Sequence, residues 1–143
     1  EEVAASVRVP LLHIADATFD ALQKRAIHRV GLLGTKYTMQ QDFIKGKLKE
    51  RGLEVLVPES EDMEMINSVI FNELCVGKIL PESKEKFLKV IEKLKAQGAE
   101  GVILGCTEIG LLIRKADTAL PVFDTTEIHG QAAVDFALAS ESA

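Results

Sequence analysis

The feature that most constrains the fold is an alternation of short, uniformly apolar segments with longer amphipathic ones. The apolar segments are "VPLLHI" (9–14), "RVGLLG" (29–34), "LEVLVP" (53–58), "GVILG" (101–105) and "LPVFD" (120–124). Short runs of this kind are typical of strands buried on both faces. The helices expected around them are 16–27, 38–52, 60–77, 82–98, a short one from about 107, and 125–139. This order predicts an α/β fold, a parallel sheet flanked by helices on both faces.

Local signals predict where the helices begin and end. Thr38 and Gln41 have the spacing of a capping box for the helix at 38–52, and Gly52 supplies its stop. Asp16 is the expected cap of the helix at 16–27. Residues 1–7 resemble the end of a further helix. The chain therefore reads as one α/β unit with helical material before it.

Composition limits the classes of partner that the chain is expected to bind and the cellular compartment expected for it. The 143 residues carry a net charge of −5, so the phosphate backbone of a nucleic acid is not an expected partner. No apolar run approaches the roughly 20 residues of a membrane span, and no signal peptide is recognisable. The two cysteines, Cys75 and Cys106, predict a reduced, cytoplasmic chain. No cysteine or histidine pair has zinc-ligand spacing, so we expect no metal.

Polar residues follow the predicted strands. In open parallel sheets, ligands bind beyond the carboxyl ends of the strands, so the residues there should form one rim. They are His13 and Asp16 after the first strand, Thr35, Tyr37 and Thr38 after the second, Cys106, Thr107 and Glu108 after 101–105, and Asp124 and Thr125 after 120–124.

Cys106 is the sharpest candidate for chemistry. A thiol at a helix N-terminus faces free N–H groups and the positive end of the helix dipole, which favour the reactive thiolate. The alternative is that Cys106 is a small core residue, as we expect for Cys75. Glu108 is expected either to cap the helix start or to orient a catalytic group.

Two other groups of residues each allow two interpretations. The hydroxyls of Thr35 and Thr38, which follow Gly34, could hold a carboxylate or phosphate, or could simply cap the helix. His129 lies one turn into the last helix, where a lone histidine is more often structural than functional.

Several long segments together resemble the aspartate/glutamate racemase family, and within it the L-aspartate/L-glutamate-specific amino-acid racemases. They are "PLLHIADAT", "VGLLGTKYTMQQDF", "INSVIFNELCVG", "QGAEGVILGCTEIGLL" and "LPVFDTTEIH". The resemblance implies two similar α/β lobes with the site between them, and catalysis without a cofactor.

The resemblance also implies roles for particular residues. In the family, one thiolate removes the Cα proton of an aspartate or glutamate substrate while a thiol on the opposite lobe reprotonates the other face. Cys106 matches the cysteine of the second lobe. The expected substrate-binding residues are Thr35, Tyr37, Thr38, Thr107 and Glu108, and Asp124 and His129 are possible additions.

The sequence departs from the family in one important respect. The first-lobe motif that carries the partner base, of the Cys-Asn-Thr or Thr-Asn-Thr type, is absent. We therefore expect 1–14 to be the end of a first lobe with a hinge, 15–120 the second lobe, and 121–143 a return segment packing toward the first. Phe123, Val134 and Phe136 would then lack part of their cover. The expected partners are a missing N-terminal lobe with the second base, and a second copy in a homodimer.

Two other function classes remain open at this point. Related proteins of the superfamily, namely hydantoin racemases, maleate isomerases and arylmalonate decarboxylases, reuse the cysteine positions with other substrates. The chain could also be a non-catalytic module that binds an anion or a partner through an open face. A thiol redox function is disfavoured because there is no Cys-x-x-Cys pair.

Overall fold

A four-stranded parallel sheet forms the centre of the molecule. The computed structural model describes residues 5–141, with side chains for 5–139. The strands are β1 (Arg29–Leu33), β2 (Glu54–Leu56), β3 (Gly101–Leu104) and β4 (Val122–Asp124), in the order β2-β1-β3-β4. All three pairings are parallel. The predicted α/β fold with a parallel sheet is confirmed.

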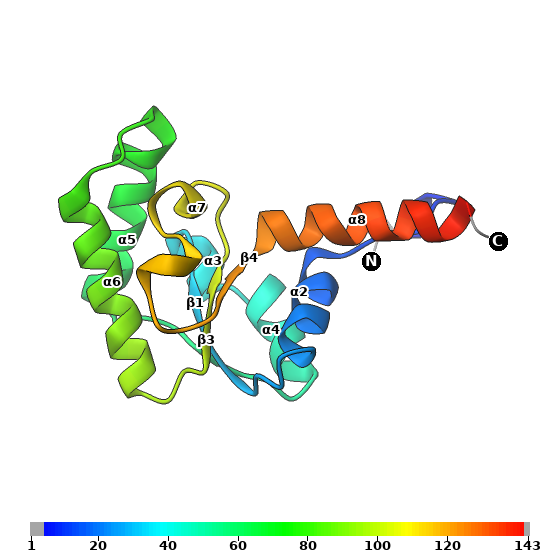
Figure 1. Ribbon diagram of the computed structural model, residues 1–143, viewed down its shortest axis with the longest axis horizontal. Coiled ribbons are helices and arrows are strands. Elements are labelled where there is room, and N and C mark those ends of the chain that lie inside the picture. The colour runs from blue at the N-terminus through cyan, green and yellow to red at the C-terminus, as the bar shows by residue number, and fades with distance from the viewer. Residues whose placement is uncertain (1–4, 142–143) are drawn as a thin grey trace.

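Helices cover both faces of this sheet, as predicted. They are α2 (Ile14–Gln23), α3 (Lys36–Gln40), α4 (Asp42–Glu50), α5 (Ser60–Asn72), α6 (Pro81–Ala96), α7 (Ile109–Leu112) and α8 (Thr125–Glu141), with short 3-10 helices η1 (Leu74–Val76) and η2 (Lys115–Asp117). Helices α5 and α6 lie on one side and α2 and α4 on the other (Figure 1). Helix α8 extends away from this body.

Side chains of each central strand alternate between two hydrophobic clusters. On β3, Val102 and Leu104 point into the cluster built with α5 and α6, whereas Ile103 points into the cluster with α2 and α4. Both clusters are nearly dry: Phe87 on α6 and Leu22 on α2 are each 0% exposed. The period of two in burial is what a strand covered on both faces requires.

Glycines let neighbouring elements approach the sheet closely. A methyl group added at Gly31 in β1 would lie 2.9 Å from Leu94 Cδ1 on α6. One added at Gly101 in β3 would lie 2.9 Å from the Phe123 ring. These distances are shorter than real Cβ contacts, so a side chain at either position would force its neighbour to move.

The strand expected at 9–14 does not form. Val9 and Leu11 are 70% and 53% exposed, and no strand pairs with them. The side chain of His13 instead caps α2, because Nδ1 accepts the N–H of Ala15 at 3.1 Å. The helix therefore begins at Ile14, and the expected cap Asp16 lies in its first turn.

The helix expected at 38–52 is two helices, α3 and α4, separated at Gln41. Thr35 caps α3 by accepting the N–H of Thr38 at 3.2 Å, so the capping box assigned to Thr38 and Gln41 is wrong. Gln41 has an extended backbone, with a ψ of 162°, and starts α4 without a side-chain cap. The break turns α3 over the end of β1.

Helix α8 is the least covered element. Val134 and Phe136 are each 52% exposed, in line with the incomplete cover expected of this segment, whereas Phe123 is buried against α2 and α4. Of the helix expected at 1–7, residues 5 and 6 are helical, and residues 1–4 lie outside the described residues. Within 5–141, no helix combines the length and apolarity that crossing a membrane requires.

We predict that Gly105→Ala destabilises the protein by about 1–3 kcal/mol, the usual cost of overpacking. The new methyl group would lie 3.0 Å from the Leu33 carbonyl oxygen and 3.2 Å from Thr38 Cγ2. Gly130→Ala in α8 is the matched control, because nothing lies within 4 Å of its added methyl group. The control should instead stabilise α8 by about 0.5–1 kcal/mol. Urea unfolding of both variants measures the two changes, and equal stability would contradict the packing argument.

Candidate active site

The carboxyl ends of three adjacent strands lie level with one another. Leu33 in β1 is paired with Leu104 in β3, and Leu104 is paired with Asp124 in β4. The residues that follow these positions therefore leave the sheet at the same edge. Three of the four predicted loops meet there, and the fourth, after 9–14, is replaced by the start of α2.

Thr35 and Thr38 form a compact hydroxyl pair at the end of β1. Their Oγ1 atoms lie 3.1 Å apart, and Thr38 is 6% exposed whereas Thr35 is half-buried. Gly105, at the end of β3, donates its N–H to the Leu33 carbonyl at 2.7 Å and lies against the Thr38 methyl group. This contact brings the loop with Cys106 beside the hydroxyl pair.

Cys106 is held by the carboxylate of Glu108. The Cys106 Sγ donates to Glu108 Oε2 at 2.8 Å, and the Thr107 hydroxyl donates to the same oxygen at 2.7 Å. Cys106 is half-buried and packs against the cluster that contains Leu74. The three consecutive residues thus form one hydrogen-bonded unit, in which Glu108 orients the thiol.

This arrangement stabilises the thiol rather than the thiolate. Burial and the hydrogen bond to Glu108 raise the pKa of Cys106 to about 12. The same bond and that from Thr107 lower the pKa of Glu108. The expected thiolate at a helix N-terminus is therefore wrong for this state of the chain. Helix α7 has only four residues and begins at Ile109, so little dipole reaches the sulfur.

Asp124 and His129 have structural partners. Asp124 Oδ1 accepts the N–H groups of Thr126 and Glu127 at 2.9 and 3.4 Å, and so caps the start of α8. His129 Nε2 lies 2.9 Å from the Leu12 carbonyl oxygen, where it ties α8 to the segment before α2. The structure thus favours the structural alternative for His129.

His13 and Thr125 also serve the framework. Burial and nearby Lys47 lower the pKa of His13, which keeps its Nδ1 free to accept the capping bond. Thr125, which is 3% exposed, donates its hydroxyl to the Leu104 carbonyl at 2.9 Å and so fastens the start of α8 to β3.

Tyr37 and Cys75 are both exposed at the surface. Tyr37 is 66% exposed and stacks on Phe43, with ring centroids 5.7 Å apart, so its hydroxyl is available at the surface. Cys75, expected to pack in the core, is exposed on η1. Helix α7, just after Cys106, packs against η1.

Sequence reasoning missed Asn67. This side chain on α5 accepts the N–H of Lys36, the residue after Thr35, through Oδ1 at 2.8 Å. Lys36 Nζ also pairs with Glu64, one turn earlier on α5. A lone asparagine in an amphipathic helix carries no signal in the sequence, because its partner is 31 positions away.

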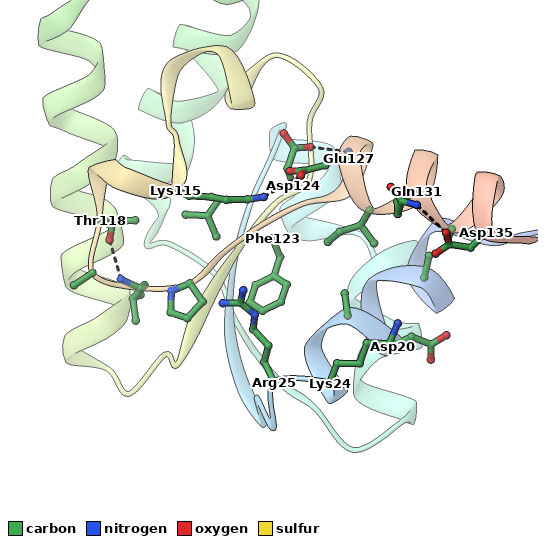
Figure 2. A pocket seen from close by; sticks show the side chains of 18 residues that line it. Asp20, Lys24, Arg25, Lys115, Thr118, Phe123, Asp124, Glu127, Gln131 and Asp135 are labelled. Carbon is green, nitrogen blue, oxygen red and sulfur yellow. Dashed lines mark hydrogen bonds and ion pairs between the residues drawn. The ribbon is translucent and has the colours of Figure 1, made fainter.

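A groove lies away from Cys106. It has a volume of about 660 Å³ and runs along the free edge of β4, between α2 and α8 (Figure 2). Arg25 lies over the Phe123 ring in this groove, 6.0 Å from its centroid, and Lys115 pairs with Glu127 at its mouth. Asp124 lines the groove, but the thiol and the hydroxyl pair do not. The candidate site is therefore an open edge.

Within the described part of the chain, no three His, Cys, Asp or Glu side chains gather in a way that could hold a metal ion. The polar groups at the open edge are a thiol, hydroxyls and a carboxylate. Their chemistry is that of proton transfer and of binding to an oxyanion or carboxylate.

A sequence profile of the Asp/Glu/hydantoin racemase family matches residues 1–133. The chain belongs to this family.

Solved structures agree with this membership. The racemase-family chain is 48% identical to a candidate Asp/Glu racemase from Yersinia pestis, with a TM-score of 0.92 over 96% of this chain. It is 44% identical to an aspartate racemase homologue from Pyrococcus horikoshii OT3, with a TM-score of 0.89 over 95% of this chain. The chain spans only 60% of the length of each of these relatives.

Two further similar proteins have lower sequence identity to this chain. The Picrophilus torridus aspartate racemase is 24% identical, with a TM-score of 0.63 over 80% of this chain and 47% of that one, and shows the fold alone. A protein of Pectobacterium carotovorum subsp. carotovorum, encoded in the pnlA 3′ region, is 25% identical over 122 residues, which make up 84% of this chain and 80% of that protein.

We predict that Glu108→Gln lowers the pKa of Cys106, because the carboxylate that opposes ionisation of the thiol is replaced by a neutral amide. Alkylation by iodoacetamide requires the thiolate, so the pH profile of Cys106 labelling should move to lower pH. Cys75→Ser in both proteins leaves Cys106 as the reacting thiol. An unchanged profile would show that Glu108 does not control the protonation of Cys106.

Proposed function

We propose that this chain is the Cys106-bearing lobe of a cofactor-independent aspartate/glutamate racemase. Membership of the Asp/Glu/hydantoin racemase family supports racemase-type chemistry. The observation that carries the proposal is the Cys106 thiol, held by Glu108, next to the Thr35–Thr38 hydroxyl pair on one open edge. A proton donor beside a carboxylate-binding corner is what inversion at Cα needs.

In the proposed reaction, Cys106 begins as the acid. Its raised pKa keeps the proton on sulfur at neutral pH. A thiolate on an opposing surface removes the Cα proton from one face of the substrate, and Cys106 gives its proton to the other face. The products are the inverted amino acid, a thiol on the opposing surface and a Cys106 thiolate. In the reverse direction, Cys106 acts as the base.

The hydroxyls would hold the substrate while the proton moves. Thr35 and Thr38 lie together at the end of β1, so two hydroxyls share one corner. Thr107 follows the thiol, and its hydroxyl supports Glu108. Hydrogen bonds to a carboxylate stabilise the charge that develops when the neighbouring Cα–H is removed. The exposed Tyr37 is proposed as a further contact, from the side facing solvent.

The opposing surface is proposed to come from a second lobe. The solved relatives are longer, since this chain spans 60% of each. Val134 and Phe136 on α8, and Val9 and Leu11 before α2, are exposed and apolar. Apolar surface of this kind is typical of a binding interface. We infer that a lobe bearing the second base covers α8 and closes the site over Cys106.

The proposal extends to the quaternary structure and the compartment. We propose a homodimer, which sedimentation of the full-length protein would test. Two free cysteines, one of them exposed, suit a reducing cytoplasm.

We predict that Cys106→Ala lowers exchange of the Cα hydrogen of L-aspartate by at least about 10²–10⁴-fold, the usual contribution of a positioned acid or base. The assay follows deuterium uptake and formation of D-aspartate in heavy water. Cys75→Ala is the matched control, because it removes the other sulfur, which is exposed. Retained exchange in Cys106→Ala, or an equal loss in Cys75→Ala, would overturn the assignment.

We predict that the paired Thr35→Val, Thr38→Val variant raises KM for aspartate about tenfold or more, because hydrogen bonds to a charged group are lost. Loss of the Thr35 cap should also cost about 0.5–2 kcal/mol of stability. The paired change to serine keeps both hydroxyls and should restore KM. Equal KM values for the valine and serine pairs would leave only the capping role.

The description of the family also names hydantoin racemases, so the substrate needs a direct comparison. Exchange measured with L-aspartate, L-glutamate and a 5-substituted hydantoin, together with formation of fumarate from maleate, separates these activities. Activity on hydantoin or maleate alone would replace the amino-acid proposal. Aspartate binding without any proton exchange in the full-length protein would instead favour a non-catalytic anion-binding role.

A further inference from the structure

Asn67 occupies a place that a framework role does not fully explain. Its Oδ1 accepts the N–H of Lys36 at 2.8 Å, which fixes the orientation of the amide because a donor must face the oxygen. The other end of the amide, Nδ2, has no hydrogen-bond partner among the described residues. Asn67 is half-buried, and no buried side-chain nitrogen or oxygen in the described chain lacks a partner, so Nδ2 must reach solvent.

The Asn67 side chain is anchored beside the candidate site. Lys36 lies between Thr35 and Thr38, so the Asn67 amide is anchored to the same turn that carries the hydroxyl pair. Helix α5 also contributes Met63 and Ile66 to the cluster against which Cys106 packs. The Asn67 amide is therefore attached, from the α5 side, to the turn that carries the hydroxyl pair.

A carboxylate bound at this edge would need a further hydrogen-bond donor, which the Asn67 amide can supply. A carboxylate has about four lone-pair sites, more than two hydroxyls can fill. An amide held through its oxygen is rigid, so its N–H donors lose little conformational freedom when they bind an anion. Lys36 does not compete for the same role, because its ammonium group pairs with Glu64.

We propose that Asn67 is a further substrate-binding residue, whose side-chain amide donates a hydrogen bond to a carboxylate of the amino-acid substrate while its oxygen holds the Thr35–Thr38 turn in place. The inference rests on the proposed function, since it names a second element, α5, as part of the same site. It assigns α5 a contact with substrate in addition to its packing on the sheet.

The two roles of the amide can be separated by substitution. Asn67→Asp keeps the oxygen that accepts from Lys36 and removes the N–H donors, so the turn stays anchored while the substrate contact is lost. Glu64→Gln is the matched control, because it weakens the other link between α5 and Lys36 without touching Asn67. The dicarboxylate succinate serves as the probe, since it binds carboxylate sites and has no amino group to react.

Binding of succinate to the full-length protein is measured by calorimetry in 0.5 M NaCl, which reduces the long-range effect of the negative charge that the Asn67→Asp substitution adds. Asn67→Asp should weaken binding about tenfold or more, and Glu64→Gln should leave it unchanged. In the unsubstituted, ¹⁵N-labelled protein, the Asn67 side-chain N–H₂ signals should shift during a succinate titration. With aspartate as substrate, KM should rise in Asn67→Asp more than kcat falls.

Unchanged succinate affinity in Asn67→Asp, or Asn67 N–H₂ signals that do not move at saturation, would overturn the proposal. These measurements are independent of catalysis. If the protein binds succinate through Asn67 yet exchanges no Cα hydrogen, the proposed racemase function fails while the assignment of Asn67 stands. If exchange occurs and Asn67→Asp behaves like the unsubstituted protein, only the assignment of Asn67 fails.

Discussion

The position of β3 between β1 and β4 is the constraint on which the rest of the structure depends. β3 pairs with both neighbours in parallel, and its side chains supply both hydrophobic clusters. The same pairing sets Leu33, Leu104 and Asp124 level with one another. The loops that follow these three residues therefore meet at one edge of the sheet, and strand pairing alone brings them there. A shift of one residue in register would exchange the two faces of the strand and also separate the thiol from the hydroxyl pair.

The fold was predictable because strands and helices have different periods. Four of the five apolar segments are strands, since each is short and flanked by helical patterns on both sides. The segment 9–14 was mistaken because its composition is strand-like, but whether a strand forms depends on a neighbour to pair with. The split between α3 and α4 was missed for a related reason. Thr35 and Thr38 are both good caps, and only the turn after β1 decides between them.

The sequence predicted which residues gather at the candidate site, but not the hydrogen bonds that they form there. The Gly-Cys-Thr-Glu turn and the two threonines come together as expected, because strand order brings them there. The protonation of Cys106 could not be deduced, since it depends on where the Glu108 carboxylate folds back. Asn67 was out of reach because its contact joins two helices, α3 and α5, that are distant in the sequence. Sequence patterns report faces and caps, whereas such contacts depend on tertiary packing.

The central place of β3 also has a consequence for how the chain folds as it is made. His28 and Glu100, which bond to each other beside the β1–β3 ladder, are 72 positions apart. Neither cluster is complete before β3 has left the ribosome, because that strand contributes to both. Until then the side of β1 that pairs with β3 has no partner. Contacts this distant form slowly, and chains that wait for them are the ones that aggregate or recruit chaperones during synthesis.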